Sequence, residues 1–136
     1  MPGVSTNIQV SKDGKYIMAA GIYKPRVRCY EVANLSMKFE RCLDSEVVKF
    51  EMLSDDYSKV VFLQTNRFVE FHAQYGRYYR YIKTFKLFFY SFILFLVFLL
   101  YSTRIPRFGR DLKYHYQTCN LYIVGTGSVK CFFYYY

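Results

Sequence analysis

A run of alternating basic residues is the first feature of this sequence that could do chemistry. Lys24, Arg26 and Arg28 occupy every second position of one short segment. Because alternate residues of a β-strand point to the same face, a strand here would present three cations together, as binding to a phosphate backbone requires. The same pattern is also typical of a solvated strand edge, where charges discourage pairing with other chains. The residues therefore predict either an RNA contact or a protected edge.

A second basic segment combines cations with aromatic rings. Its cations recur at every third position and two tyrosines follow them: Arg104, Arg107, Arg110, Lys113, Tyr114 and Tyr116. The rings could stack on unpaired bases while the cations contact phosphates. The alternative is a surface loop whose aromatic rings pack into the next structural unit. The formal net charge of +9 favours an anionic partner in general, either RNA or an anionic membrane surface.

The sequence contains no recognisable catalytic or metal-binding motif. The cysteines contain no Cys-x-x-Cys pair, which makes a zinc site improbable: Cys29, Cys42, Cys119 and Cys131. The adjacent carboxylates Asp55 and Asp56 lie in a Ser-Asp-Asp-Tyr stretch that is typical of a turn. We interpret His72 and His115 as structural residues. The sequence thus predicts a protein that is not an enzyme and has no metal or cofactor site.

Short strands separated by turns must position these residues. The segment SKDGKYIMAAG (11–21) places a polar turn before an apolar strand, and SDDYSKVVFL (54–63) repeats it 43 residues later. A third turn and strand begin around Asn120, and removing the 22 residues 81–102 leaves a spacing of 40. A period of about 40–45 residues with four short strands is that of β-propeller blades. The pattern predicts an all-β chain that forms a partial β-propeller, interrupted by one segment.

The interrupting segment, 81–102, is strongly apolar. As a helix, 85–102 would extend about 27 Å, just short of the roughly 30 Å of hydrocarbon in a bilayer. Basic residues flank it on both sides, so the charge distribution predicts no orientation. One hypothesis is therefore a small single-pass membrane protein. The other is a translated intron, because Phe, Leu, Ile and Val codons share a central U and would be encoded by a pyrimidine-rich tract before a splice acceptor.

The chain also resembles a known family, the nucleolar protein 10 family (essential nuclear protein 2 in yeast). The resemblance rests on five stretches: VSKDGKYI (10–17), YKPRVRCY (23–30), KFERCLDSEV (38–47), LSDDYSK (53–59) and TRIPRFGRD (103–111). It implies a non-catalytic WD-repeat-like scaffold of the nucleolus with about two to three blades in this chain. It also implies a role in small-subunit ribosomal RNA processing, with ribosome-assembly proteins and pre-ribosomal RNA as partners.

Four segments are expected on this basis. Residues 5–80 would form propeller blades, 81–102 a hydrophobic insertion, 103–128 the continuation of the propeller, and 129–136 an aberrant aromatic tail. The resemblance has no counterpart for 81–102. We expect a nucleolar location, and a membrane location only if 85–102 is genuinely expressed and inserted. The candidate contacts to RNA or protein are the nine residues of the two basic segments.

Overall fold

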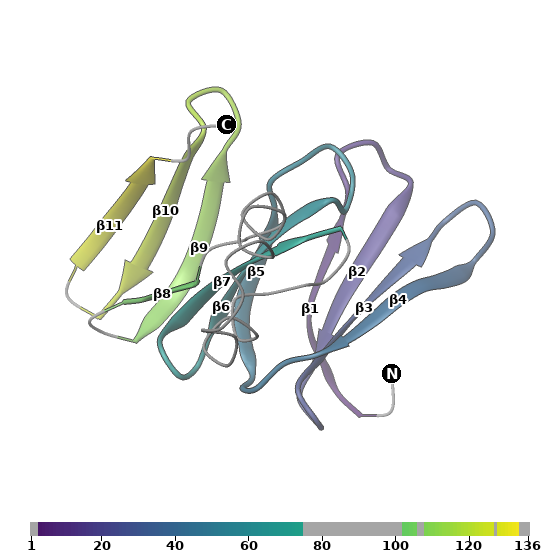
Figure 1. Ribbon diagram of the computed structural model, residues 1–136, viewed down its shortest axis with the longest axis horizontal. Helices are drawn as coiled ribbons and strands as arrows, with labels where there is room; N and C mark the ends of the chain where they lie inside the picture. Colours follow the sequence, from purple (N-terminus) through teal and green to yellow (C-terminus); the bar gives the residue numbers. More distant parts are fainter. Residues whose placement is uncertain (1–2, 75–101, 106–107, 127, 134–136) are drawn as a thin grey trace, which may run out of the picture.

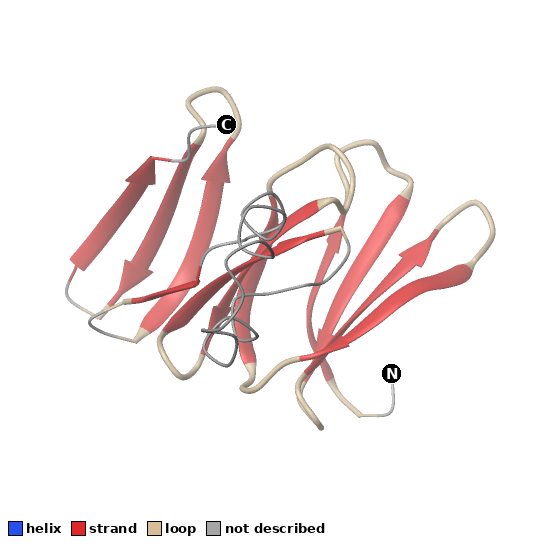
Figure 2. Cartoon of the chain, viewed as in Figure 1, coloured by secondary structure: helices blue, strands red, loops and turns tan. Residues whose placement is uncertain are grey.

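The fold of the chain consists of β-strands. The computed structural model describes residues 3–74, 102–105, 108–126 and 128–133. Within these ranges it contains strands and turns but no helix (Figure 2), which confirms the predicted all-β class. The strands are β1 (Ser5–Val10), β2 (Tyr16–Gly21), β3 (Arg26–Glu31), β4 (Ser36–Cys42), β5 (Val47–Met52), β6 (Lys59–Gln64), β7 (Phe68–Ala73), β8 (Ser102–Arg104), β9 (Gly109–His115), β10 (Asn120–Gly125) and β11 (Ser128–Phe133).

The strands form three antiparallel sheets that stand side by side (Figure 1). The first sheet has the order β1-β2-β3-β4, the second β5-β6-β7-β8, and the third β9-β10-β11. Each sheet is a meander in chain order, and β5 contacts both β1 and β9, so the first strands of the three sheets are neighbours. This is the arrangement of propeller blades, numbered 1 to 3 in chain order, with β1, β5 and β9 as the inner strands. The partial β-propeller predicted from the repeat is confirmed.

Blade 2 contains the point at which the repeat is interrupted. Strand β8 pairs with β7, and Ser102 lies opposite Glu70 while Arg104 lies opposite Phe68. The chain thus returns to the same blade after residues 75–101, which lie outside the described residues. Ser102, predicted to end the insertion, instead begins strand β8. The described part of the chain holds no helix that could cross a membrane, and the predicted span 85–102 lies outside that part except for Ser102.

The third blade uses residues of the predicted aromatic tail. Strand β11 pairs with β10 from Ser128 to Phe133, with Asn120 opposite Phe133 and Gly125 opposite Ser128. Residues 134–136 lie outside the described residues. Residues 129–133 of the predicted tail, together with Ser128, therefore form the third strand of this sheet.

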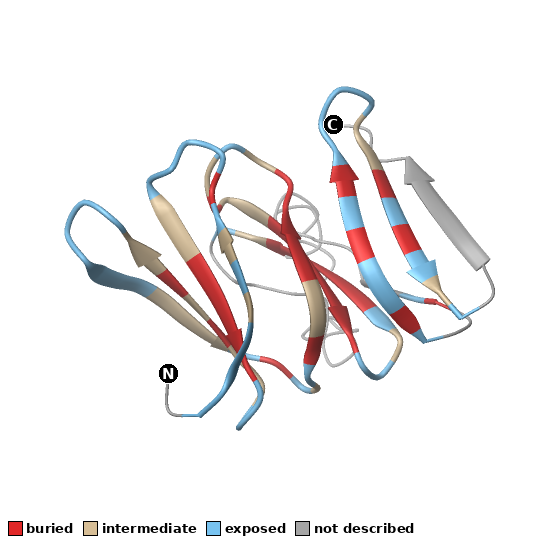
Figure 3. Ribbon diagram, turned by 180° about the vertical axis from the view of Figure 1, so that it is seen from behind, coloured by how far each residue is buried: buried red, intermediate tan, exposed pale blue. Residues whose placement is uncertain are grey.

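Two apolar cores lie between the blades. Phe62 and Val60 of β6 pack with Met18 and Val27 of blade 1 in the first core. The alternate residues Val61 and Leu63 of the same strand point the other way, toward the second core. Residues of β7, β9 and β10 complete this core: Val69, Leu112, Leu121 and Ile123. Blade 2 is thus covered on both faces (Figure 3), which explains why β6 reads as a continuous apolar run.

The repeated turns are built from the same hydrogen bonds. In the first, Asp13 Oδ1 accepts a hydrogen bond from Lys15 N at 3.0 Å. In the second, Asp56 Oδ1 accepts from Ser58 N at 2.9 Å and from Ser54 Oγ at 2.8 Å. Burial opposes ionisation of Asp56, but these hydrogen bonds prevail and lower its pKa. The carboxylates of this motif therefore organise turns.

Candidate binding surfaces

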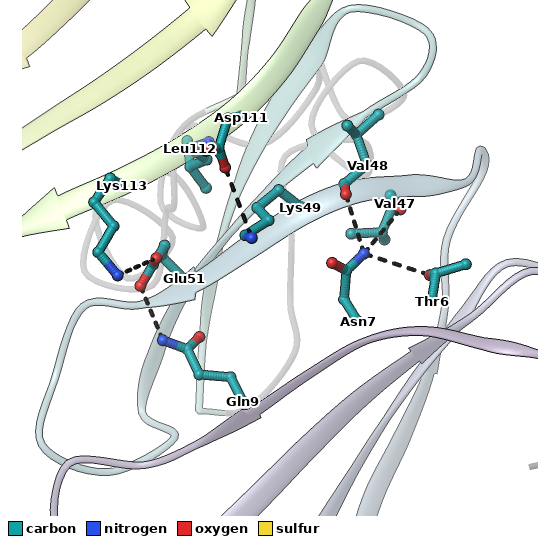
Figure 4. A network of polar contacts seen from close by, with 10 residues as sticks. All are labelled: Thr6, Asn7, Gln9, Val47, Val48, Lys49, Glu51, Asp111, Leu112 and Lys113. Atoms are coloured by element: carbon teal, nitrogen blue, oxygen red, sulfur yellow. Dashed lines mark hydrogen bonds and ion pairs between the residues drawn. The ribbon is translucent and has the colours of Figure 1, made fainter.

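A polar network joins the inner strands of all three blades (Figure 4). At its centre Glu51 of β5 is 3% exposed. Its Oε2 accepts a hydrogen bond from Gln9 Nε2 of β1 at 2.9 Å, and its Oε1 accepts one from Lys113 Nζ of β9 at 3.2 Å. Gln9 Oε1 in turn accepts from Met52 N at 3.2 Å. Each blade contributes one side chain, so the network fixes the blades relative to one another.

Weaker contacts continue this network along β5. Asn7 Nδ2 donates to the carbonyl oxygen of Val48 at 3.0 Å. Lys49 Nζ and Asp111 Oδ1 are 3.7 Å apart, and both side chains are exposed. Lys113, a predicted RNA contact, thus has a carboxylate partner in Glu51, although its side chain is 77% exposed. Lys113 and Lys49 therefore present cations that are partly neutralised by their own neighbours.

The first predicted basic set divides between a strand and a turn. Arg26 and Arg28 lie on one face of β3, as the alternation predicts, and both bind Glu40 of β4. The distances are 2.6 Å from Arg26 NH1 to Oε1 and 2.8 Å from Arg28 Nε to Oε2. Lys24 precedes the strand and has a positive φ of 45°. Two guanidinium groups share one carboxylate, so the Arg26, Arg28 and Glu40 cluster retains a single net positive charge.

The face that carries Arg26 and Arg28 is open. Strand register places Ile8 and Val10 on the same side of blade 1, because Ala19 lies opposite both Ile8 and Arg28. Ile8 is 73% exposed and Val10 is 54% exposed, whereas the opposite face of the blade is buried against blade 2. Figure 3 shows most of β1, which carries Ile8 and Val10, in the colour of exposed residues. An apolar strip with a charged rim of this kind is suited to contact another protein surface.

The second predicted set does not form one continuous surface. Arg104 and Arg110 are exposed near the start of β9, and Arg107 lies outside the described residues. Tyr114 is 4% exposed and packs in the second core. Its ring therefore follows the packing alternative predicted from the sequence and is not placed to stack on a base. Tyr116 lies beyond the other end of β9, where its hydroxyl donates to Met52 O at 2.7 Å. Six residues of extended chain, roughly 20 Å, separate Arg110 from Tyr116.

Backbone hydrogen bonds define the two rims of the blades. At one rim the β1–β2 and β5–β6 turns meet, since Asp13 N donates to Asp55 O at 3.0 Å. At the other, Ile105 N donates to Arg67 O at 2.9 Å and Thr126 N to Phe108 O at 3.3 Å. We call this second rim the basic rim, with the side chains Lys24, Arg67, Phe68, Arg104, Phe108 and Arg110.

The basic rim contains residues that the sequence patterns did not single out. Arg67 occupies the β6–β7 turn, 43 residues after Lys24 in the β2–β3 turn, so the two cations are equivalent in the repeat. Arg67 also has a positive φ, 70°. Applying the period to Lys24 would have identified it. Phe108 carried no signal, because a single exposed ring in a connection has no periodicity.

His72 is a buried residue of β7. It is 2% exposed, and its Nε2 lies 3.3 Å from Glu70 Oε2 while its Nδ1 lies 3.5 Å from Arg41 NH1. Burial lowers the pKa of His72 and also lowers the pKa of Arg41 to about 10. A neutral ring can donate to the carboxylate and accept from the guanidinium at the same time. His72 therefore links the outer strand of blade 1 to blade 2 as a structural residue.

Comparison with known proteins identifies relatives in several eukaryotes. Residues 1–84 match the family described as "Nucleolar protein 10-like, N-terminal domain". The chain is 58% identical over 128 residues to "Nucleolar protein 10" of Xenopus laevis and 56% identical to that of Homo sapiens, covering 94% of this chain and 15% of each relative. It is 41% identical over 124 residues to "Ribosome biogenesis protein ENP2" of Saccharomyces cerevisiae, covering 91% of this chain and 14% of the relative. The chain thus spans about 15% of the length of these relatives.

Solved structures share the fold at low sequence identity. The β-propeller domain of Cps50 (Swd1) from Myceliophteria thermophila superposes with a TM-score of 0.62 at 8% identity, covering 92% of this chain and 32% of that chain. BBS1N, solved in complex with ARL6DN, superposes with a TM-score of 0.63 at 10% identity, covering 96% and 34%. At such low identity these likenesses establish the propeller fold alone.

Proposed function

Since the chain belongs to the nucleolar protein 10-like family, we propose that it acts as a non-enzymatic β-propeller scaffold in ribosome biogenesis. More specifically, we propose a nucleolar role in small-subunit ribosomal RNA processing. The observation that carries this proposal is the sequence identity of 41–58% to nucleolar and ribosome biogenesis proteins over more than nine-tenths of the chain. The three blades support it, because propellers commonly present rims and faces to several partners at once.

The surfaces divide this scaffold role between two kinds of partner. We assign pre-ribosomal RNA to the cations Lys24, Arg104 and Arg110, which are exposed and lie at or near one rim. Arg107 belongs to the same assignment by sequence. The open face of blade 1, with Ile8 and Val10 beside the Arg26, Arg28 and Glu40 cluster, is suited to a ribosome-assembly protein. Lys113 and Tyr116 lie with the inner-strand network and the opposite rim, where either partner could reach them.

Sedimentation of the tagged full chain from cell lysates would test this proposal. We expect the chain to migrate with particles that contain small-subunit ribosomal RNA precursors and to give a nucleolar signal by imaging. A variant with Ile8→Asp and Val10→Asp should leave these particles if the open face binds an assembly protein, whereas Leu35→Asp in the β3–β4 turn serves as the matched surface control. Recovery only as free protein would refute the scaffold role. Recovery only in detergent after carbonate extraction would instead support the membrane-protein alternative based on 85–102.

The interrupting segment allows a separate proposal. We propose that 81–102 is intron-derived sequence inserted after β7 of blade 2, with Ser102 as the first residue of β8. Pairing of β8 with β7 supports this, because the flanking chain completes one sheet on either side of the segment. Transcript reads should include a spliced product that joins the codons of Arg80 and Thr103. Deep coverage of this junction without any such product would refute the proposal.

A further inference from the structure

We propose that the basic rim binds single-stranded RNA, with phosphates held by its cations and bases stacked on its exposed rings. The inference rests on the proposed function, which supplies RNA as a partner, and it assigns the contact to Arg67, Phe68 and Phe108 in addition to the predicted cations. Base stacking on aromatic side chains beside a positively charged track is the general mode of single-strand binding.

Two cation–aromatic pairs form the centre of this rim, where blades 2 and 3 meet. The guanidinium carbon of Arg67 lies 5.7 Å from the centroid of the Phe108 ring, and that of Arg104 lies 5.9 Å from the centroid of Phe68. Phe108 is 62% exposed and Phe68 is 37% exposed. Both guanidinium planes and both rings are surfaces on which a base can stack. A phenylalanine ring that is exposed to water contributes little packing free energy to the fold. A base stacked on the ring would bury its surface.

The equivalent turns of blades 1 and 2 each place a cation next to a ring in the sequence, with the ring before the cation in one turn and after it in the other. Lys24 follows Tyr23, which is 71% exposed, and Arg67 precedes Phe68. Both cations adopt a left-handed backbone, with φ of 45° and 70°. Glycine or asparagine would adopt this conformation at lower cost, so long cationic side chains there point to a function other than stability.

Charge on the rim favours a path along blades 2 and 3. The β4–β5 connection carries the exposed carboxylates Asp44 and Glu46, which repel phosphates between Lys24 and the rest of the rim. Arg67, Arg104 and Arg110 lie on the other side of this connection. A double-stranded RNA would satisfy the cations but leave Phe68 and Phe108 exposed, because its bases are already stacked. An unpaired strand therefore fits the rim better than a duplex does.

Fluorescence anisotropy with the full 136-residue chain and a labelled 12-nucleotide oligouridine would test this inference. The variant Arg67→Asn/Arg110→Gln should reduce the slope of log affinity against log salt concentration by about 1.4, because each phosphate that is no longer neutralised by a cation accounts for about 0.7. The control Lys15→Gln/Lys38→Gln removes the same charge from exposed cations away from the basic rim and should leave the slope unchanged. Phe108→Ser should weaken binding roughly 5- to 100-fold.

Folding of the variants does not limit this test. Asparagine tolerates the positive φ at position 67 and Arg110 is exposed, so Arg67→Asn/Arg110→Gln should unfold at about the same urea concentration as the unmodified chain. An unchanged salt slope in this variant, or equal affinity for Phe108→Ser, would overturn the inference. Equal affinity for a 12-base-pair RNA duplex or for an acidic peptide would overturn it as well. If oligouridine binding fails while the chain still migrates with ribosomal precursors, the scaffold role stands and the rim contact does not.

Discussion

Glu51 is the carboxylate on which three blades converge, and its replacement by alanine should destabilise the propeller substantially. Its hydrogen bond from the Gln9 amide joins a charged, buried acceptor to its donor and is worth roughly 1.5–3 kcal/mol. The ion pair with Lys113 adds at most about 1 kcal/mol, because the lysine side chain is 77% exposed. The cost of desolvating the carboxylate offsets part of this sum. We expect Glu51→Ala to lower the free energy of unfolding by about 2–3 kcal/mol.

Urea unfolding of the full chain, followed by circular dichroism, would measure this loss. A double-mutant cycle of Gln9→Ala with Glu51→Ala should give a coupling energy of about 1 kcal/mol or more, since the two side chains contact each other directly. The matched control Lys113→Gln removes only the exposed partner and should cost less than about 1 kcal/mol. A coupling energy near zero, or a larger loss for Lys113→Gln than for Glu51→Ala, would refute the view that Glu51 joins the blades.

Three further predictions concern buried positions. Burial lowers the pKa of His72 below 6.5, so the contribution of His72 to stability is full above pH 6.5 and is lost as the pH falls through the folded-state pKa. Urea unfolding should therefore give a lower free energy of unfolding at pH 5.5 than at pH 7.5. The variant His72→Gln should lack this difference. Gly109→Ala would place a methyl group 2.7 Å from Leu63 Cδ1 and should cost about 1–3 kcal/mol in thermal unfolding, and an unchanged midpoint would contradict the packing described. Burial raises the pKa of Cys29 to about 11, so iodoacetamide at pH 8 should label the exposed Cys42 and spare Cys29. Mass spectrometry of peptides would measure the labelling, and equal labelling of the two thiols would count against the burial of Cys29.

Much of the architecture could be predicted because it depends on short-range patterns. The offset of 43 residues between Lys15 and Ser58 reflects turns that repeat their own local hydrogen bonds, and the structure contains both turns. The alternation of Arg26 and Arg28 likewise predicted a shared face of one strand, which β3 confirms. Their partial neutralisation by Glu40 could not be predicted, because it depends on the register of β3 with β4, which shifts between Cys29 and Tyr30.

The amino-acid sequence by itself determined where strands and turns form and that they recur as blades, because alternation, turn chemistry and period are local properties of the chain. Tertiary structure alone decided which charged groups remain available. Lys113 meets Glu51 because β9 lies beside β5, 62 residues away in the sequence. Arg67 and Phe108 meet at one rim because a backbone hydrogen bond from Ile105 N to Arg67 O holds the β8–β9 connection, which carries Phe108, against the β6–β7 turn. Such contacts depend on how blades pack, and no spacing within one strand contains that information.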